Sequence, residues 1–379
     1  MLAAVIAAVP VCIWFYLLLG RGGFWRIADK LAPPMRSGIP DRRVVAVVPA
    51  RNEAPVIAAT LASLFVQKLS VVLVDDNSTD DTAAVARREA VRSGCSDQLF
   101  IISGRPLPPG WTGKLWAMHQ GLERAAALAP DYVLLTDADI VHGHDSVAEL
   151  VGIAESGRYD LVSYMVKLAC VSFAEKALIP AFVFFFFMLY PPAWIASPKS
   201  KAAGAAGGCM LLRPEALMNA GGLEVIRSTM IDDCALARII KRSGGRIWLG
   251  LTRSTLSNRY YGDFREIGRM ISRTAFHQLK HSWLILAGTV AGLVVTYLLP
   301  VILLFSGSAL AAAGGALAWL MMSLAYLPMV RFYGRSWLWA CALPFIACFY
   351  LGATVHSAIQ YWRGQGGEWK GRAQDLPTR

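Results

Sequence analysis

Residues 44–53 read VVAVVPARNE, residues 71–80 read VVLVDDNSTD, and residues 132–139 read YVLLTDAD. In each of these stretches a short apolar run is followed directly by polar side chains. Such runs predict strands that are buried on both faces of a sheet. We predict strands at Val44–Val48, Val71–Val74, Leu99–Ile102 and Tyr132–Leu135, with helices at Ile57–Phe65 and Ala83–Ala90. This alternation of strands and helices predicts an α/β domain with a mostly parallel sheet.

Polar clusters fall at the carboxyl ends of three of these strands. They are Pro49–Glu53, Asp75–Ser78 and Asp137–Asp139. Ligands of open parallel sheets gather beyond the carboxyl ends of the strands. We therefore expect the three clusters to lie around one binding site.

The D-x-D pair, Asp137 and Asp139, can face one hard divalent cation such as Mg²⁺ or Mn²⁺. A cation held there would stabilise the charge of a leaving diphosphate. A single D-x-D is also typical of a solvated turn. At the end of the second strand, Asp75-Asp76 can accept hydrogen bonds from a base or ribose, whereas helix capping accounts for Ser78 and Asp80.

Two features of the later sequence could belong to the same site. Asp232 and Asp233 begin an amphipathic helix over Ala235–Lys241, where acids are also common for helix-dipole reasons alone. The small residues of Gly204–Cys209 allow a backbone to approach a ligand closely, although alone they indicate only a loop rich in turns.

The composition predicts that part of the chain lies in lipid. Of its 379 residues, 55% are hydrophobic and only 17% are charged, fewer charges than a soluble domain would carry. Leu2–Gly20 is an almost unbroken apolar run of the length that a membrane-crossing helix needs. A cleaved signal peptide would carry positive charge before its apolar run, whereas here the charge follows at Arg21. We therefore predict an uncleaved transmembrane anchor over residues 1–20.

Further apolar segments follow. The segment near residues 178–196 is interrupted by Pro180 and by Pro191-Pro192, and the stretch between these prolines is too short to cross a bilayer. We predict an interfacial helix there, with a buried core helix as the alternative. Residues 282–360 contain three candidate transmembrane helices, and residues 361–379 form a basic tail. The three candidates are Ser282–Phe305, Ala309–Val330 and Leu338–Ile359.

Charge and cysteine content indicate the compartment. The formal net charge is +11, and the basic residues cluster beside the apolar spans. This placement suits the positive-inside rule and contact with anionic lipids better than binding of nucleic acid. The 7 cysteines show neither a disulfide framework nor the spacing of a zinc site. We expect a multi-pass protein of a bacterial-type cytoplasmic membrane, with the α/β domain facing the cytoplasm and no nucleic-acid partner.

Taken in order, the motifs VPARNE, VDDNSTD, TDAD, GGC and DD resemble family 2 glycosyltransferases of the GT-A fold. The similarity covers Val44–Phe276, so we place the catalytic domain at residues 43–276. Longer stretches are similar to the hopene-associated glycosyltransferases. These stretches are Leu18–Trp25, Pro108–Trp116, Ala205–Leu211, Ile231–Ala237, Arg246–Thr252 and Glu368–Arg372.

The resemblance implies roles for the residues of the donor site. Asp76 would contact the nucleotide base, and the loop after the first strand would line the nucleoside pocket. The residues of that loop are Pro49, Ala50, Arg51, Asn52 and Glu53. Asp137 and Asp139 would hold the nucleotide and a Mg²⁺ or Mn²⁺ ion, with Asp139 the more direct ligand. Lys114 begins a predicted helix, where it can meet a phosphate or remain solvated.

The resemblance also implies the residues that act on the acceptor. Asp233 would be the general base, with Asp232 as its neighbour. Gly207, Gly208 and Cys209 would form the floor of the acceptor site. Many family members carry Q-x-x-R-W after the base, whereas this chain reads Met-Ile-Ser-Arg-Thr at residues 270–274. Arg273 remains for diphosphate or acceptor contact, and the loss of the rest argues for transfer of a single sugar.

The sequence therefore predicts an inverting, metal-dependent glycosyltransferase that moves one sugar from a nucleotide-sugar, with UDP favoured by the resemblance, to a membrane lipid. A hopanoid-related acceptor is implied by the resemblance alone. Polyprenyl phosphate, a sphingolipid-like lipid or a carotenoid are alternative acceptors. A non-catalytic membrane lipid-binding protein and a nucleotidyltransferase are alternative functions, and the sequence leaves the oligomeric state open.

Overall fold

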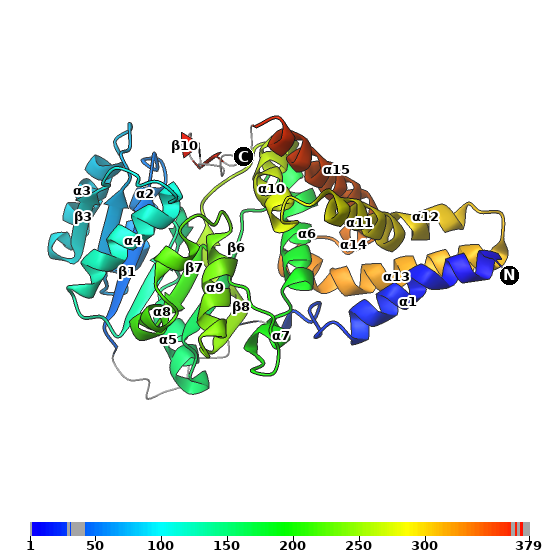
Figure 1. The fold of residues 1–379 in the computed structure, drawn as a ribbon, viewed down its shortest axis with the longest axis horizontal. Helices are drawn as coiled ribbons and strands as arrows, with labels where there is room; N and C mark the ends of the chain where they lie inside the picture. The colour runs from blue at the N-terminus through cyan, green and yellow to red at the C-terminus, as the bar shows by residue number, and fades with distance from the viewer. Residues whose placement is uncertain (1, 29–30, 32–41, 365–367, 370–371, 374–379) are drawn as a thin grey trace. The chain divides into compact units, whose positions relative to one another are not determined.

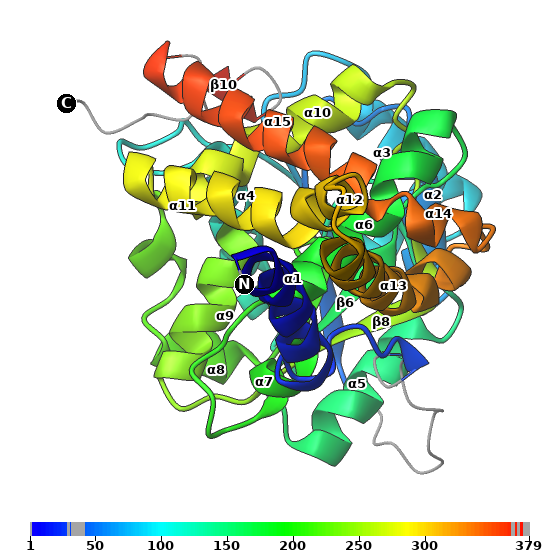
Figure 2. The ribbon, with the colours of Figure 1, turned by 90° about the vertical axis from the view of Figure 1, so that its right-hand side faces the viewer.

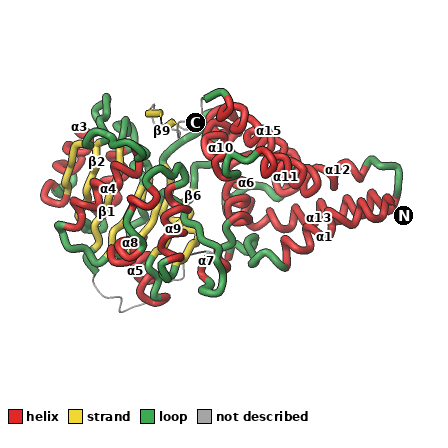
Figure 3. Tube along the Cα trace, in the orientation of Figure 1, coloured by secondary structure: helices red, strands yellow, loops and turns green. Residues whose placement is uncertain are grey.

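The computed structural model describes residues 2–28, 31, 42–364, 368–369 and 372–373. The chain forms two compact units. The α/β unit comprises Lys30–Ala169, Trp194–Arg259 and Glu368–Arg379, and the helical unit comprises Met1–Asp29, Cys170–Ala193 and Tyr260–Gly367. Among the described residues, every strand belongs to the α/β unit, whereas the helical unit consists of helices and their connections (Figure 3).

The α/β unit is built on an eight-stranded sheet with the strand order β3-β2-β1-β4-β7-β6-β8-β5 (Figure 1). The strands are β1 (Val44–Ala50), β2 (Ser70–Asp75), β3 (Leu99–Ser103), β4 (Tyr132–Thr136), β5 (Ile140–Val141), β6 (Leu161–Lys167), β7 (Cys209–Leu212) and β8 (Ile247–Ser257). Parallel pairs join β1 to β2 and β4, β2 to β3, and β6 to β8. The four predicted strands and the mostly parallel sheet are confirmed. The antiparallel strand β7, which lies between β4 and β6, was not predicted.

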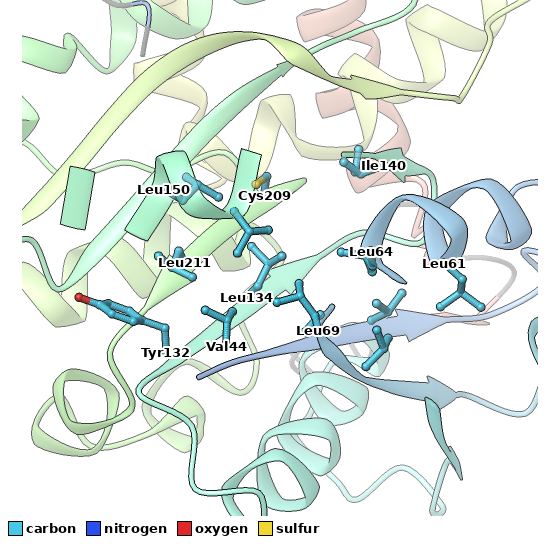
Figure 4. Close-up of a cluster of buried hydrophobic side chains, with 14 of the residues drawn as sticks. Val44, Leu61, Leu64, Leu69, Tyr132, Leu134, Ile140, Leu150, Cys209 and Leu211 are labelled. Atoms are coloured by element: carbon cyan, nitrogen blue, oxygen red, sulfur yellow. The ribbon is translucent and has the colours of Figure 1, made fainter. Parts of the chain in front are cut away.

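Every residue of β1 is apolar and buried. Helices therefore cover both faces of the sheet at this strand. Successive side chains of a strand point to opposite faces. On one face Val44 lies in the core that includes Leu61 and Leu64 of α2 (Ile57–Phe65), part of which is drawn in Figure 4. On the other face α4 (Gly113–Ala126) packs against β1 so closely that a Cβ atom at Gly121 would lie 2.3 Å from Val47 Cγ1.

The remaining helices of the α/β unit connect strands or flank the site. They are α3 (Thr82–Arg92), α5 (Ser146–Gly157), α8 (Pro214–Asn219), α9 (Asp232–Arg242) and the short η2 (Ser96–Gln98) and η3 (Leu223–Ile226). The helix α9 matches the predicted amphipathic helix and begins at its two acids. The helices α4 and α9 carry site residues in their first turns.

The helical unit contains α1 (Leu2–Leu19), α6 (Phe173–Leu189), α10 (Phe264–Gln278), α11 (Trp283–Leu293), the π-helical turn η4 (Val294–Leu298), α12 (Leu299–Leu304), α13 (Ala309–Phe332), α14 (Leu338–Cys341) and α15 (Leu343–Trp362). By length and composition, four helical segments of the described chain could cross a membrane, and Ala4–Leu19 is a shorter apolar helix. The four are Phe173–Ala196, which includes α7 (Pro192–Ala196), Trp283–Leu304, Ala309–Phe332 and Leu343–Trp362. These helices indicate association with a membrane.

Two helix pairs organise the helical unit: α1 packs along α13, and α10 packs along α15 (Figure 2). A proline in an apolar helix leaves one backbone carbonyl without its usual donor. Pro300 cannot donate to the carbonyl of Thr296, and the indole Nε1 of Trp14 donates to that carbonyl at 2.9 Å. The first helix thereby satisfies a polar group that the proline would otherwise leave unbonded in an apolar environment.

The helix α6 begins earlier than the segment predicted near residues 178–196. It begins at Phe173, where Ser172 and Glu175 form a capping box, and it continues through Pro180 to Leu189. Within the helical unit its side chain Phe184 packs against Phe24 and Tyr326. The helix α6 therefore packs against other segments of its unit, and its placement at a membrane interface or in a core stays a prediction.

Two other predicted segments also change. The predicted span over residues 338–359 is broken near Ala342, because Pro344 suits the first turn of α15 rather than a helix interior. The basic tail at residues 361–379 lies largely outside the described residues. Within it, β9 (Glu368–Trp369) pairs antiparallel with β10 (Arg372–Ala373).

Candidate active site

A lysine lies at the centre of the acidic residues that the sequence predicted. Lys114, in the first turn of α4, places its Nζ 2.8 Å from Asp137 Oδ1 and 3.4 Å from Asp232 Oδ2. The three side chains come from distant parts of the chain and are 21%, 34% and 13% exposed, respectively. Tertiary structure therefore joins the start of α4, the end of β4 and the start of α9 in one partly buried ionic cluster.

The charges of this cluster do not balance. Burial disfavours the charged form of Lys114, but the neighbouring aspartates, Asp137 first, outweigh this and raise the pKa of the lysine. Burial, together with the charges of Asp139 and Asp232, raises the pKa of Asp137, although Lys114 opposes the shift. Carboxylates thus outnumber the lysine, so the cluster favours additional positive charge.

Asp233 has the environment of a general base. Its Oδ2 accepts a hydrogen bond from the Gly207 N–H at 2.8 Å, and its Oδ1 accepts one from the Cys234 N–H at 2.6 Å. Burial and the charge of Asp232 raise the pKa of Asp233 to about 6, even though Lys114 and these two N–H groups oppose the shift. Such a carboxylate is ionised at neutral pH but is more basic than an ordinary aspartate, which suits proton removal.

Gly207 lies in close contact with Asp233. A Cβ atom at Gly207 would lie 3.2 Å from Asp233 Oδ2, so a side chain there would require the carboxylate to shift by a few tenths of an ångström. The next carbonyl, that of Gly208, accepts from Thr136 Oγ1 at 2.9 Å and from the Asp137 N–H at 3.4 Å. The glycine pair therefore connects the base to the D-x-D turn.

Cys209 does not share this position. It is the first residue of β7, it is fully buried, and it belongs to the hydrophobic core shown in Figure 4. Burial raises the pKa of its thiol to about 12. The side chain of Cys209 therefore lies in the core, on a strand that pairs with β4, and its role in the floor of the acceptor site stays a prediction.

Asp139, the second aspartate of the D-x-D pair, forms an ion pair with Arg259. Arg259 donates from Nε to Asp139 Oδ2 at 2.8 Å and from Nη2 to Glu53 Oε1 at 3.1 Å. Arg259 was not among the residues predicted from the sequence. It lies two residues beyond the end of β8, so the rule that ligands gather at carboxyl strand ends could have pointed to it.

The loops after β1 and β2 are joined as the sequence predicted. Asp76 is fully buried, and Arg51 donates from Nη1 to its backbone carbonyl at 2.6 Å. The Asn52 N–H donates to Ser78 Oγ at 3.0 Å, and the Glu53 N–H donates to Thr82 Oγ1 at 2.8 Å. These bonds hold Pro49–Glu53 beside Asp76.

A glycine after β3 borders this loop pair. A Cβ atom at Gly104 would lie 3.0 Å from both the Cα and the Oδ1 atoms of Asp76. Asn77 donates from Nδ2 to the Gly104 carbonyl at 3.4 Å. A side chain at residue 104, which was not among the predicted site residues, would thus crowd Asp76.

The approach to α4 is also held in place. The Thr112 N–H donates to the Arg227 carbonyl at 2.8 Å. Trp116 donates from Nε1 to the Arg105 carbonyl at 3.2 Å, and the Arg105 guanidinium lies over the Trp116 ring, 4.9 Å from its centroid. These contacts fix the first turn of α4, and with it Lys114.

The residues present fit a divalent cation that arrives with a nucleotide. Within the described part of the chain, no group of three or more His, Cys, Asp or Glu side chains could hold a metal by itself. Asp137 and Asp139 offer two carboxylates from one turn, and Mg²⁺ commonly takes its remaining ligands from substrate phosphates and water. Asp232 Oδ2 is buried and accepts no hydrogen bond from the described residues, although Lys114 Nζ lies 3.4 Å from it.

One predicted residue lies elsewhere. Arg273 belongs to α10 of the helical unit, whereas the other predicted site residues belong to the α/β unit. Contact of Arg273 with the diphosphate or the acceptor stays a prediction.

Comparisons with known proteins agree with this architecture. Residues 45–221 match the model of glycosyl transferase family 2. Two uncharacterized proteins, from Mycobacterium bovis and Mycobacterium tuberculosis, are each 38% identical to the chain over 103 residues, which are 26% of this chain. The match spans only 23% of the length of either relative.

A solved structure is similar over almost the whole chain. It is a mannosyltransferase from Pyrobaculum calidifontis in complex with GDP-Man and Mn²⁺. The TM-score is 0.53 at 21% identity, and the likeness covers 94% of this chain and 98% of that chain. At this identity the likeness concerns the fold, which is GT-A-like. The chain therefore combines a GT-A-like α/β region, of which residues 45–221 match the glycosyl transferase family 2 model, with several long apolar helices.

Proposed function

We propose that the protein is an inverting glycosyltransferase that moves one sugar from a nucleoside-diphosphate sugar to a hydroxyl group of a membrane lipid. The observation that carries this proposal is the cluster in which Lys114 lies between Asp137 and Asp232 while Asp233 is held by the Gly207 N–H. The family 2 domain supports the donor class, and the long apolar helices support a lipid acceptor.

The acceptor side of the reaction belongs to Asp233. Its carboxylate removes the proton of the acceptor hydroxyl while that oxygen attacks the anomeric carbon. The two backbone N–H groups orient the carboxylate, and Lys114 keeps it ionised near neutral pH. Attack from the side opposite the leaving group inverts the configuration of the sugar, provided that both reactants are held in line.

The donor side belongs to the D-x-D turn and Lys114. Lys114 carries a positive charge that can stabilise a leaving diphosphate. Asp137 and Asp139 would hold a Mg²⁺ or Mn²⁺ ion, which supplies charge stabilisation to the diphosphate oxygens. The structurally similar mannosyltransferase was solved with Mn²⁺ and GDP-Man, which supports this assignment.

The nucleoside is assigned to the loops after β1 and β2. Asp76 would contact the base, with Pro49, Ala50, Arg51, Asn52 and Glu53 around it. We propose UDP as the nucleotide and a hopanoid-related lipid as the acceptor, on the motifs quoted from the sequence. The positive-inside rule supports a catalytic unit on the cytoplasmic side of a bacterial inner membrane.

The test is a product analysis. The full chain is purified in detergent and incubated with a panel of nucleotide-sugars, Mn²⁺ and extracted membrane lipids, and the products are identified by mass spectrometry. We expect a lipid whose mass has increased by one sugar, together with release of nucleoside diphosphate. Asp145→Asn is the matched control, because Asp145 is 58% exposed and contacts only its neighbour His144 among the ion pairs described.

Other results would point to other functions. Release of pyrophosphate would identify a nucleotidyltransferase. Lipid binding without any donor turnover would favour a non-catalytic lipid-binding protein. Glycosylation of polyprenyl phosphate that survives Asp233→Asn would reassign the acceptor, because a phosphate needs no strong base.

A further inference from the structure

Arg259 bridges two acids that the sequence assigned to the donor site. Its Nε lies 2.8 Å from Asp139 Oδ2, and its Nη2 lies 3.1 Å and 3.3 Å from the two carboxylate oxygens of Glu53. The carboxylates are only 10% and 11% exposed, whereas Arg259 is 37% exposed. The guanidinium is therefore the more accessible partner in this cluster.

The guanidinium of Arg259 and a divalent cation would compete for the lone pairs of one carboxylate oxygen. Mg²⁺ approaches a carboxylate oxygen to about 2.0–2.1 Å, and Mn²⁺ prefers similar oxygen ligands. Asp139 Oδ2 already accepts hydrogen bonds from Arg259 Nε and, at 3.4 Å, from Ser257 Oγ. A cation that binds Oδ2 must compete with Arg259 for this oxygen.

Arg259 contacts one carboxylate oxygen of Asp139 but both carboxylate oxygens of Glu53. Loss of the Asp139 contact leaves the guanidinium tethered by the two-oxygen contact with Glu53. Glu53 is itself held by the bond from its backbone N–H to Thr82 Oγ1. A tethered guanidinium stays close to Asp139, where the proposed function places a diphosphate, and its planar fork suits phosphate oxygens.

We propose that Arg259 is a positioning residue of the donor site that exchanges partners when the donor binds. In the nucleotide-free protein it neutralises Asp139. When the cation that accompanies the nucleotide takes Asp139 Oδ2, the guanidinium keeps its contact with Glu53 and pairs with the diphosphate. This inference rests on the proposed function for the identity of the ligand.

The experiment uses the full chain in detergent and calorimetric titrations. Mn²⁺ is titrated first into nucleotide-free protein, and UDP and GDP are titrated separately at saturating Mn²⁺. The variants are Arg259→Gln, which removes the charge, and Arg259→Lys, which keeps the charge without the fork. The control is Arg246→Gln, because Arg246 precedes the opposite end of β8 and lies over the Tyr159 ring.

The proposal predicts opposite changes in two affinities. Arg259→Gln should bind Mn²⁺ alone about 5–10-fold more tightly, because a competing cation has gone, and should bind the nucleoside diphosphate at saturating Mn²⁺ about tenfold more weakly. Arg259→Lys should fall between the wild type and Arg259→Gln in both titrations. Arg246→Gln should match the wild type, and thermal unfolding should show that all variants are folded.

Several outcomes would overturn the exchange. They are unchanged or weaker Mn²⁺ binding by a folded Arg259→Gln, unchanged nucleotide affinity, or tighter Mn²⁺ binding that Asp139→Asn in the same chain does not abolish. The lipid glycosylation assay separates this inference from the proposed function. Sugar transfer by the wild type with unaltered Mn²⁺ binding in Arg259→Gln would refute only the exchange, whereas both affinity changes without any sugar transfer would refute only the function.

Discussion

The α/β unit and the helical unit treat buried polar groups in opposite ways. In the α/β unit, Lys114 serves Asp137 and Asp232 together, so ionised groups share one counter-charge. In the helical unit the buried polar groups are mostly neutral and paired individually. For example, Ser357 Oγ donates to the Ser272 carbonyl and accepts from the Phe276 N–H, and Tyr350 donates to the Leu178 carbonyl at 2.9 Å.

This difference separates function from stability. Burial of a polar group is costly unless it is hydrogen-bonded, and burial of a charge is costly unless it is paired. In the helical unit, groups such as Ser357 and Tyr350 are hydrogen-bonded by atoms of the same unit, as an apolar environment requires, although the buried His277 Nδ1 neither accepts nor donates a hydrogen bond among the described residues. The α/β unit leaves an excess of carboxylates that a charged ligand can relieve. Substitutions in the acidic cluster should therefore alter chemistry, whereas those in the helical unit should alter stability.

The largest effect is expected at Asp233, the proposed base. Asp233→Asn should lower turnover by about 10²–10⁴-fold, because the amide cannot accept the acceptor proton. Binding of nucleoside diphosphate should remain close to that of the wild type. Steady-state rates and calorimetric titrations measure the two quantities, with Asp145→Asn as the control. Retained turnover in a folded variant would assign the base elsewhere.

The next effect concerns the shared lysine. Lys114→Met removes the cation between Asp137 and Asp232, so kcat/KM should fall by about 10²–10³-fold, as it does when a preorganised charge-stabilising group is lost. The donor should also bind more weakly. A variant with normal kcat/KM would show that Lys114 is only structural and that the acidic cluster balances its charges without it.

A smaller effect is expected at the metal pair. Chelation with EDTA, or the substitution Asp139→Ala, should weaken binding of nucleoside diphosphate by about tenfold or more through loss of a charge-assisted contact. Titrations with and without Mn²⁺ measure this. Equal affinities of Asp139→Ala and wild type in Mn²⁺ would remove Asp139 from the metal site.

The pH dependence tests the raised pKa of Asp233, which is about 6. Below this pH the carboxylate is protonated and cannot act as a base, so kcat/KM should fall about tenfold for each pH unit below 6. Because the folded pKa lies above the unfolded value of 3.8, the stabilisation from the protonated form is complete below the unfolded pKa and is lost as pH rises through about 6.

The raised pKa of Asp233 also predicts how the melting temperature of Asp233→Asn, relative to the wild type, depends on pH. At pH 8 Asp233→Asn should unfold at a higher temperature than the wild type, and this advantage should disappear at pH 4. Melting temperatures across this range provide the measurement. A lower melting temperature of the variant at pH 8 would contradict the raised pKa.

The smallest effect is expected in the helical unit. Trp14→Phe removes the donor to the Thr296 carbonyl and should lower the free energy of unfolding by about 1–2 kcal/mol, without changing turnover per folded molecule. Trp283→Phe is the control, because Trp283 is 65% exposed. A change in the pH profile of kcat/KM in Trp14→Phe would contradict the conclusion that the helical unit affects stability and the α/β unit affects chemistry.

Much of the α/β unit could be predicted because its signals are local. Apolar runs such as Val44–Val48 predict strands, and polar residues directly after them predict a ligand site. The antiparallel strand β7 escaped prediction, since its four residues, Cys209–Leu212, carry no periodic signal of their own. For the same reason the burial of the Cys209 side chain was not predicted.

The sequence by itself determined the order of strands and helices, the acids at the strand ends and the apolar segments, because each depends on residues close together along the chain. Tertiary structure alone decided that Lys114 joins Asp137 to Asp232 and that Arg259 joins Asp139 to Glu53. Pairing of side chains this far apart depends on how strands and helices pack, and the charges that result depend on the burial that packing creates.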